Sequence, residues 1–191
     1  MTQEDFLKRI AHFLESAGIP YMVAGSVGSG YYGQPRSTND VDIVIDPTAE
    51  QLEQWLLLLG SDYYVSPESA RDALSRRFMF NVIDLTGGWK ADLIVRKDRP
   101  FSEEEFRRRK TNLLHGQSIA MACAEDIILS KLEWNGITPS ERQIRDALQV
   151  AVLQWANLDR LYLRKWASEL GVADEMEELL RAAEQAQPPT A

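Results

Sequence analysis

The spacing of apolar residues changes near the middle of the chain. Up to about residue 116, short apolar or β-branched runs alternate with amphipathic segments, which predicts strands alternating with helices. Beyond it, apolar residues recur every three or four positions in four successive segments, as in helices that bury one face. We therefore expect an α/β (α+β) fold: an α/β domain over residues 1–116, with a mixed sheet and flanking helices, and a C-terminal helical bundle over residues 117–191.

The individual elements follow from these runs and from the turn and cap residues between them. Helices are predicted at 2–17, within 25–33, at 48–59, at 66–76 and from 102, and in the second domain at 124–134, 140–155, 158–170 and 173–185. Strands are predicted at 21–24, 40–45, 61–65, 78–85, 89–95, 111–114 and 118–121. Thr86-Gly87-Gly88 has the composition of a tight turn, so residues 78–95 should form a β-hairpin.

Two carboxylates stand at the start of the strand predicted at 40–45. Side chains alternate faces along a strand, so Asp40 and Asp42 point the same way and repel each other. A hard divalent cation relieves this repulsion, and Mg²⁺ is usually held by one or two carboxylates together with substrate phosphates. If the returning hairpin strand lies beside this one, Asp92 joins them on the same face; Asp84, on the first hairpin strand, is the weaker candidate for a third carboxylate.

A segment of small residues follows the first predicted strand. Gly25-Ser26 ends the apolar run 21–24 and would open the short helix after it. Backbone N–H groups at a helix N-terminus bind phosphate, and a glycine lets the phosphate approach the backbone closely. Gly25 and Ser26 are therefore candidate phosphate-binding residues, with a plain strand-to-helix turn as the alternative.

Composition narrows the classes of function. The net charge is −8, from 29 acidic and 21 basic residues, which argues against extended duplex DNA or other long nucleic acid as a partner. The single cysteine, Cys123, cannot form an internal disulfide, and the apolar runs are far shorter than a membrane span. We therefore expect a cytoplasmic protein with no membrane partner.

The order of the motifs in the first half of the chain resembles that of the nucleotidyltransferase superfamily related to DNA polymerase β. Gly25-Ser26, then Asp40-Val41-Asp42-Ile43, then Asp92 on a later strand follow the pattern of that superfamily. The stretch 36–42 (RSTNDVD) is similar to the bacterial abortive-infection nucleotidyltransferase toxins and their uncharacterised relatives.

The helical half extends the resemblance. The stretch 125–131 (EDIILSK) and the pair Arg145-Asp146 resemble two later motifs of the same group, in which the lysine faces the triphosphate. One motif differs: residues 96–110 carry Arg96, Lys97 and a cluster of arginines in place of the toxins' lysine-rich second motif.

This resemblance implies metal-dependent transfer of a nucleoside monophosphate from a nucleoside triphosphate to a hydroxyl group. It implies two Mg²⁺ ions, with Mn²⁺ as an alternative ion, bound by the catalytic residues Asp40, Asp42 and Asp92. Asp92 would also help to deprotonate the acceptor hydroxyl.

Nucleotide contacts are implied for four further residues. Gly25 and Ser26 would hold the β- and γ-phosphates, Lys131 would neutralise them, and Arg36 would face the triphosphate. The acceptor would be an RNA 3′ end such as that of tRNA, a protein hydroxyl or a small molecule such as an aminoglycoside. A toxin of this kind would have a cognate antitoxin as partner. The sequence selects neither the nucleotide nor the acceptor, and it leaves the oligomeric state open.

Less specific interpretations stay open. The carboxylates of the 40–45 strand also suit a solvated strand edge, Asp92 suits a surface ion pair with Lys90 or Arg96, and Lys131 suits an exposed helix face. The protein would then be a catalytically silent module of the same fold that binds a nucleotide or a partner protein.

Overall fold

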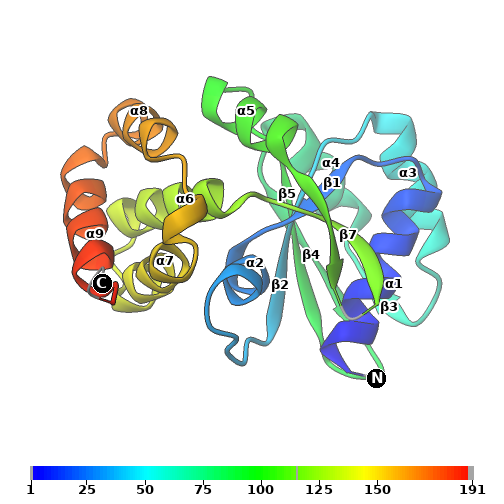
Figure 1. Cartoon of the computed structure of the whole chain (residues 1–191). Coiled ribbons are helices and arrows are strands. Elements are labelled where there is room, and N and C mark those ends of the chain that lie inside the picture. Colours follow the sequence, from blue (N-terminus) through cyan, green and yellow to red (C-terminus); the bar gives the residue numbers. More distant parts are fainter. Residues whose placement is uncertain (1, 115, 189–191) are drawn as a thin grey trace. The chain divides into compact units, whose positions relative to one another are not determined.

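The computed structural model describes residues 2–114 and 116–188, and in them a seven-stranded mixed sheet runs in the order β3-β4-β5-β2-β1-β7-β6 (Figure 1). β2 pairs parallel with β5 and β1 pairs parallel with β7, whereas the other neighbours are antiparallel. The strands are β1 (Tyr21–Val23), β2 (Asp40–Ile45), β3 (Tyr63–Tyr64), β4 (Met79–Asp84), β5 (Lys90–Val95), β6 (Lys110–Leu114) and β7 (Gln117–Met121).

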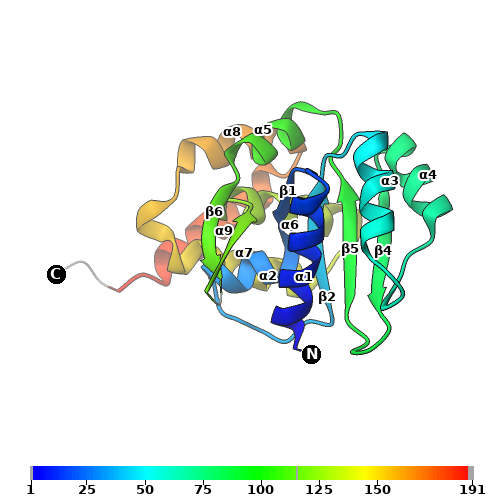
Figure 2. The same ribbon diagram turned by 90° about the vertical axis from the view of Figure 1, so that its right-hand side faces the viewer.

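Three helices cover one face of this sheet (Figures 1 and 2). They are α1 (Gln3–Ser16), α3 (Ala49–Leu58) and α4 (Pro67–Arg76), and α5 (Pro100–Arg108) follows β5 in the chain. Thr2 and Thr48 each begin a helix with a capping box, in which the threonine hydroxyl and a side chain three residues later satisfy backbone N–H groups at the helix start. Sequence-local hydrogen bonds therefore fix where α1 and α3 begin.

The covered face of the sheet is the apolar one. The β2 residues Val41, Ile43 and Ile45 are fully buried. Ile43 lies beside Leu93 of β5, which in turn lies beside Phe80 of β4, and the Phe80 ring packs 6.0 Å from the ring of Trp55 on α3. Because side chains alternate faces along a strand, Asp40 and Asp42 must point to the opposite face.

The chain divides into two compact units that are not continuous in sequence. The first holds the sheet and consists of the residues up to Ala24 together with Thr38–Ala122; the second consists of Gly25–Ser37 and the residues from Cys123 onward. The helices of the second unit are α2 (Gly25–Tyr32), α6 (Ala124–Ile137), α7 (Glu141–Leu153), a 3₁₀ turn (Trp155–Asn157), α8 (Arg160–Leu170) and α9 (Ala173–Gln185).

Helix α6 lies at the centre of the second unit, where it packs against α2, α7, α8 and α9. Its buried residues lie all around the helix and include Glu125, Asp126 and Lys131, so it is not the one-sided amphipathic helix that the sequence suggested. Neighbouring helix ends follow sequence signals: the Asp159 carboxylate accepts from two backbone N–H groups at the start of α8, and Gly171 ends α8 in the left-handed conformation at φ 73°.

The predicted fold class, a mixed sheet with flanking helices followed by helices, is confirmed, and so is the 78–95 hairpin. Helix α5 begins two residues earlier than predicted, at Pro100, because proline suits the first position of a helix. The domain boundary after residue 116 stays a prediction; the compact units differ from it mainly because Gly25–Ser37 packs with the later helices.

In the described ranges, every helix is too short or too polar to cross a lipid bilayer.

The apolar face of the sheet gives a stability prediction. Trp55 is fully buried on α3, so Trp55→Ala should lower the free energy of unfolding by about 3–5 kcal/mol through the lost burial and the cavity left behind. Leu57 on the same helix is 85% exposed, and Leu57→Ala should change it by less than about 0.5 kcal/mol. Urea unfolding of the two variants measures this contrast, and equal losses would contradict the assigned core.

Candidate active site

The first candidate cluster is a set of charged residues on β2 and β5. The parallel register places Asp42 beside Asp92 and Asp40 beside Lys90. Residues paired in this way share a face, so all four side chains lie on the face opposite the buried valine and isoleucines of β2. The expectation that Asp92 joins Asp40 and Asp42 on one face agrees with this register.

Lys90 is the cation of this cluster. Its Nζ lies 3.1 Å from Oδ1 of Asp92 and 3.6 Å from Oδ2 of Asp40, and it donates a hydrogen bond of 3.1 Å to Oδ2 of Asp92. Partial burial by itself would lower the pKa of Lys90, but the hydrogen bond and charge of Asp92 and the charge of Asp40 outweigh it, so the pKa is raised. Of the two partners proposed for Asp92, Lys90 makes the ion pair, while Arg96 pairs with Asp46.

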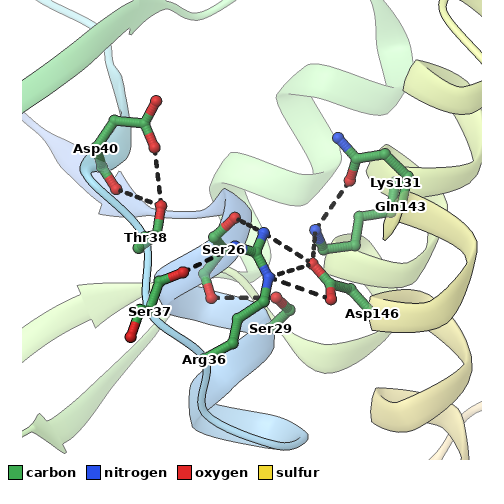
Figure 3. Close-up of polar contacts among 9 residues, drawn as sticks. All are labelled: Ser26, Ser29, Arg36, Ser37, Thr38, Asp40, Lys131, Gln143 and Asp146. Carbon is green, nitrogen blue, oxygen red and sulfur yellow. Dashed lines mark hydrogen bonds and ion pairs between the residues drawn. The ribbon is translucent and has the colours of Figure 1, made fainter. Parts of the chain in front are cut away.

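Two further hydrogen bonds fix the start of β2. The Thr38 hydroxyl donates to the Asp40 carboxylate at 2.8 Å (Figure 3), and the backbone N–H of Ala24 donates to the Asp42 carbonyl at 2.9 Å. The Asp40 side chain and the Asp42 backbone are therefore both held by neighbours within the first unit. Gly25 follows Ala24 directly in the chain.

The donor chemistry of this face suits a hard divalent cation, since it consists of carboxylate oxygens. Asp92 is 7% exposed, and its Oδ1, although within the ion pair with Lys90, accepts no hydrogen bond. Over the described part of the chain, however, no three His, Cys, Asp or Glu side chains are grouped closely enough to hold a metal ion. The possible ligands are carboxylate oxygens, which Mg²⁺ prefers, and they lie on one sheet face. The ammonium group of Lys90 lies among them.

Asp84 has a different role from the carboxylates of this face. Its side chain accepts hydrogen bonds from the backbone N–H groups of Thr86 and Gly87 and from the Thr86 hydroxyl. Burial would raise the pKa of Asp84, but these hydrogen bonds outweigh it and lower the pKa. A Cβ on Gly87 would come within 2.6 Å of the Asp84 carboxylate, so glycine is needed there. Asp84 therefore organises the β4–β5 turn.

The second candidate cluster lies in the helical unit and centres on Asp146 of α7 (Figure 3). Lys131 of α6 donates to Asp146 at 2.9 Å and to the Gln143 side chain at 2.9 Å. The Arg36 guanidinium donates to the same carboxylate, with its shortest contact at 3.1 Å. One carboxylate thus holds two cations that are far apart in the sequence.

The positive charges beside Asp146 set the direction of its pKa shift. Burial alone would raise the pKa of Asp146, but the hydrogen bonds and positive charges of Lys131 and Arg36 outweigh it and lower the pKa. The Lys131 side chain is 5% exposed, whereas that of Arg36 is 29% exposed. Arg36 is therefore the more accessible of the two predicted phosphate contacts, and Lys131 is engaged by Asp146 and Gln143.

Gly25 and Ser26 form the N-terminus of α2, as the sequence predicts. Gly25 has φ 54°, a left-handed conformation that favours glycine. The Ser26 hydroxyl accepts a hydrogen bond from Arg36, and the Ser29 hydroxyl donates back to the Ser26 carbonyl (Figure 3). Ser26 and Arg36 therefore belong to one network with Asp146.

Some members of these clusters are not predicted as site residues from the sequence. Lys90 appeared only as a rival explanation of Asp92, although its position two residues earlier on the strand places it on the same face. Gln143 carries no motif signal, and its spacing of three residues from Asp146 on α7 is the one indication that both side chains share a helix face. Asp146 stands out in the sequence only as part of the pair Arg145-Asp146.

The Asp146 cluster gives a second stability prediction. Asp146→Ala leaves the buried Lys131 ammonium without its carboxylate, so we expect a loss of about 3–5 kcal/mol in the free energy of unfolding near neutral pH. The lowered pKa of Asp146 means that the stabilisation is present above the ordinary carboxyl pKa and is lost as the pH falls through the folded-state value. The difference between wild type and variant should therefore shrink in acid, as measured by urea unfolding at several pH values.

Two variants control this experiment. The double variant Lys131→Met with Asp146→Leu removes both buried charges and should unfold closer to the wild type than Asp146→Ala does. Glu177→Ala breaks an exposed ion pair with Arg164 in the same unit and should cost less than about 1 kcal/mol. A double variant as unstable as Asp146→Ala would show that the buried charge is not the cause.

Comparison with known proteins shows the fold. No protein-family model matches the sequence, and no curated protein matches it. Solved structures do match. An antigenic nucleotidyltransferase-like protein from Paracoccidioides brasiliensis is 20% identical, with 91% of this chain and 89% of that chain covered at a TM-score of 0.57.

The solution structure of the antibiotic-resistance factor ANT(2″)-Ia is 15% identical, with 96% of this chain and 91% of that chain covered at a TM-score of 0.54. The crystal structure of ANT(2″)-Ia in complex with adenylyl-2″-tobramycin is also 15% identical, with 97% and 98% covered at a TM-score of 0.52. The sequence resemblance predicted the fold of this superfamily, and the likeness of these structures confirms it: the chain has the nucleotidyltransferase fold.

Proposed function

We propose that the protein is a metal-dependent nucleotidyltransferase that moves a nucleoside monophosphate from a nucleoside triphosphate to a hydroxyl group. The observation that carries the proposal is the β2–β5 register, which places Asp42 beside Asp92 on the face that also bears Asp40. Carboxylates grouped on one sheet face repel one another, and they take no part in the apolar packing that buries Val41, Ile43 and Ile45 on the other face. They suit a reaction in which negative phosphate oxygens must be brought to a nucleophile.

In this proposal the carboxylates Asp40, Asp42 and Asp92 bind Mg²⁺, with Mn²⁺ as an alternative. Bound metal supplies charge stabilisation for the phosphoryl group and lowers the pKa of the attacking hydroxyl. The resemblance assigns to Asp92 the acceptance of a proton from the acceptor hydroxyl, and in the structure Asp92 is buried with an Oδ1 that accepts no hydrogen bond. Two ions remain the expectation from the resemblance.

The phosphate-binding roles fall on the helical unit. Gly25 and Ser26 begin α2, where unsatisfied backbone N–H groups favour anions. Arg36 presents a planar guanidinium, which suits bidentate recognition of phosphate. Lys131 contributes positive charge from inside the unit, and it would contact phosphate itself only by releasing Asp146 or Gln143.

The acceptor is proposed at the level of a hydroxyl group. ANT(2″)-Ia, which shares the fold, has been crystallised with adenylyl-2″-tobramycin, so a small-molecule acceptor such as an aminoglycoside is one candidate. An RNA 3′ end and a protein hydroxyl are the others, and the toxin role with a cognate antitoxin rests on the sequence resemblance of residues 36–42, residues 125–131 and the pair Arg145-Asp146. The single buried thiol, Cys123, supports the cytoplasm as the proposed location.

One observation favours the second candidate, a silent nucleotide- or protein-binding module. Lys90 already neutralises part of the charge on Asp40 and Asp92, so these carboxylates have a stable arrangement without metal. A module of this kind would bind a nucleoside triphosphate through the α2 N-terminus and Arg36, and would release no pyrophosphate with any acceptor.

Pyrophosphate release separates the two candidates. With Mg²⁺, each nucleoside triphosphate and a panel of RNA, protein and aminoglycoside acceptors, the wild type should release pyrophosphate, and EDTA should abolish it. Asp42→Asn should reduce the rate by more than about a hundredfold, because the metal supplies several kcal/mol of transition-state stabilisation and each 1.4 kcal/mol is a factor of ten.

The matched control is Asp72→Asn, which changes an exposed aspartate on α4 of the same unit and should leave the rate unchanged. Binding of a fluorescent nucleoside triphosphate is measured for all three proteins. Nucleotide binding that persists with no pyrophosphate release by the wild type would favour the silent module, and equal rates for the wild type and Asp42→Asn would refute the role of the carboxylates.

A further inference from the structure

The ammonium group of Lys90 is the cation that now stands among the carboxylates of β2 and β5. It lies 3.1 Å from Oδ1 of Asp92 and 3.6 Å from Oδ2 of Asp40, so it bridges carboxylates on two neighbouring strands. The Asp42 side chain shares this face, beside Asp92 in the strand register. Lys90 therefore couples two of the three proposed metal ligands directly.

The placement of Lys90 follows from the sheet rather than from chance contact of a flexible side chain. Lys90 is the register partner of Asp40 across the parallel strand pair, and it precedes Asp92 by two residues on its own strand. Both relations put its side chain on the carboxylate face. Its side chain is 34% exposed, so it is neither buried in the sheet nor fully surrounded by water.

A bound Mg²⁺ would compete with this ammonium group for the same oxygens. Magnesium binds oxygen at about 2.0–2.1 Å in a nearly octahedral shell, so it needs the carboxylate lone pairs that now face Lys90. Two cations that contact the same carboxylates also repel each other, by about 1 kcal/mol for unit charges 4 Å apart in water and by more where water is excluded.

We propose that Lys90 is an internal counter-ion of the metal site: it holds Asp40 and Asp92 together in the resting protein and is displaced when a divalent ion binds. This inference rests on the proposed function, because it concerns the same carboxylates. It adds a residue that opposes metal binding and so sets the metal concentration at which the site fills. In the resting state the same ion pairs stabilise strands that would otherwise carry three mutually repelling charges.

Metal affinity tests the proposal without any activity measurement. Lys90→Met keeps an unbranched side chain one atom shorter and removes its charge, so Mn²⁺, counted by electron paramagnetic resonance of the free ion, should bind about tenfold tighter than to the wild type. A factor of ten corresponds to about 1.4 kcal/mol, the order of the repulsion that is removed. The metal-free variant should also melt at a lower temperature, and Mn²⁺ should raise its melting temperature by more than it raises that of the wild type.

Three further proteins make the outcome decisive. Lys90→Arg keeps the positive charge and should bind Mn²⁺ no more tightly than the wild type. Arg76→Met, which breaks an exposed ion pair on α4, should bind it equally. Asp42→Asn in the Lys90→Met background should lose the tight binding, which locates the ion on this face.

Displacement itself is visible by NMR. In ¹⁵N-lysine-labelled protein, the side-chain signal missing from Lys90→Met is that of Lys90, and it should shift when Mg²⁺ is added. Wild-type metal binding with no gain in Lys90→Met, or an unchanged Lys90 signal at saturating Mg²⁺, would overturn the counter-ion role and leave the proposed function standing. Absence of divalent-ion binding by both proteins, with and without a nucleoside triphosphate, would overturn the two together.

Discussion

The repulsion among Asp40, Asp42 and Asp92 is the constraint on which the interpretation of this protein depends, and the core of the sheet imposes it. Ile43 and Leu93 are register partners and both are fully buried against the helices that cover one face. A slip of one residue between β2 and β5 would turn that face outward and carry the carboxylates inward. The apolar contacts thus hold the strands in the one register that puts like charges side by side, and the ammonium group of Lys90 on the same face compensates part of that charge.

The phosphate-binding candidates depend on a different set of forces. After β1 the chain leaves the sheet, and residues 25–37 pack with α6 and α7 before β2 begins. In this segment, Arg36 donates hydrogen bonds to Ser26 and to Asp146, which comes 110 residues after Arg36 in the sequence. The position of the α2 N-terminus therefore follows from the stability of the helical unit, and a change at Asp146 would act on Arg36 and Lys131 at the same time.

The sequence predicts those features that depend on local patterns. Strand alternation puts Asp40 and Asp42 on one face, the Thr86-Gly87-Gly88 turn gives the hairpin, and the capping residues Thr2 and Thr48 set the helix starts. Given the hairpin, only the pairing of its second strand with β2 remained to be assumed, and the structure has that pairing. The fold class was accessible for the same reason, since alternating strands and helices followed by helices leave few arrangements.

Features that depend on distant parts of the chain were not predictable in the same way. A lysine on a helix is usually exposed, and nothing near Lys131 in the sequence indicates that other helices surround α6. The ion pair between Lys131 and Asp146 cannot be predicted from the sequence near either residue. Likewise, Gly25–Ser37 lies between two strands in the sequence, so its membership of the helical unit could not be inferred from its neighbours. In both cases tertiary packing, which local pattern does not encode, decides the environment of the charged group.

The ion pairs of Lys90 weaken the inference from three aspartates to a catalytic metal site. From the sequence, three aspartates without a metal would repel one another, and a protein with no use for metal would have little reason to carry them. In the structure, part of this repulsion is relieved without a metal ion, because the ammonium group of Lys90 lies beside two of the carboxylates. Three negative charges and one positive charge still leave this face with a net charge of −2 when all four groups are ionised, and the buried Oδ1 of Asp92 still accepts no hydrogen bond. That remaining negative charge, rather than the number of aspartates, is the property that a purely structural role for the face leaves unexplained and that a divalent cation would neutralise.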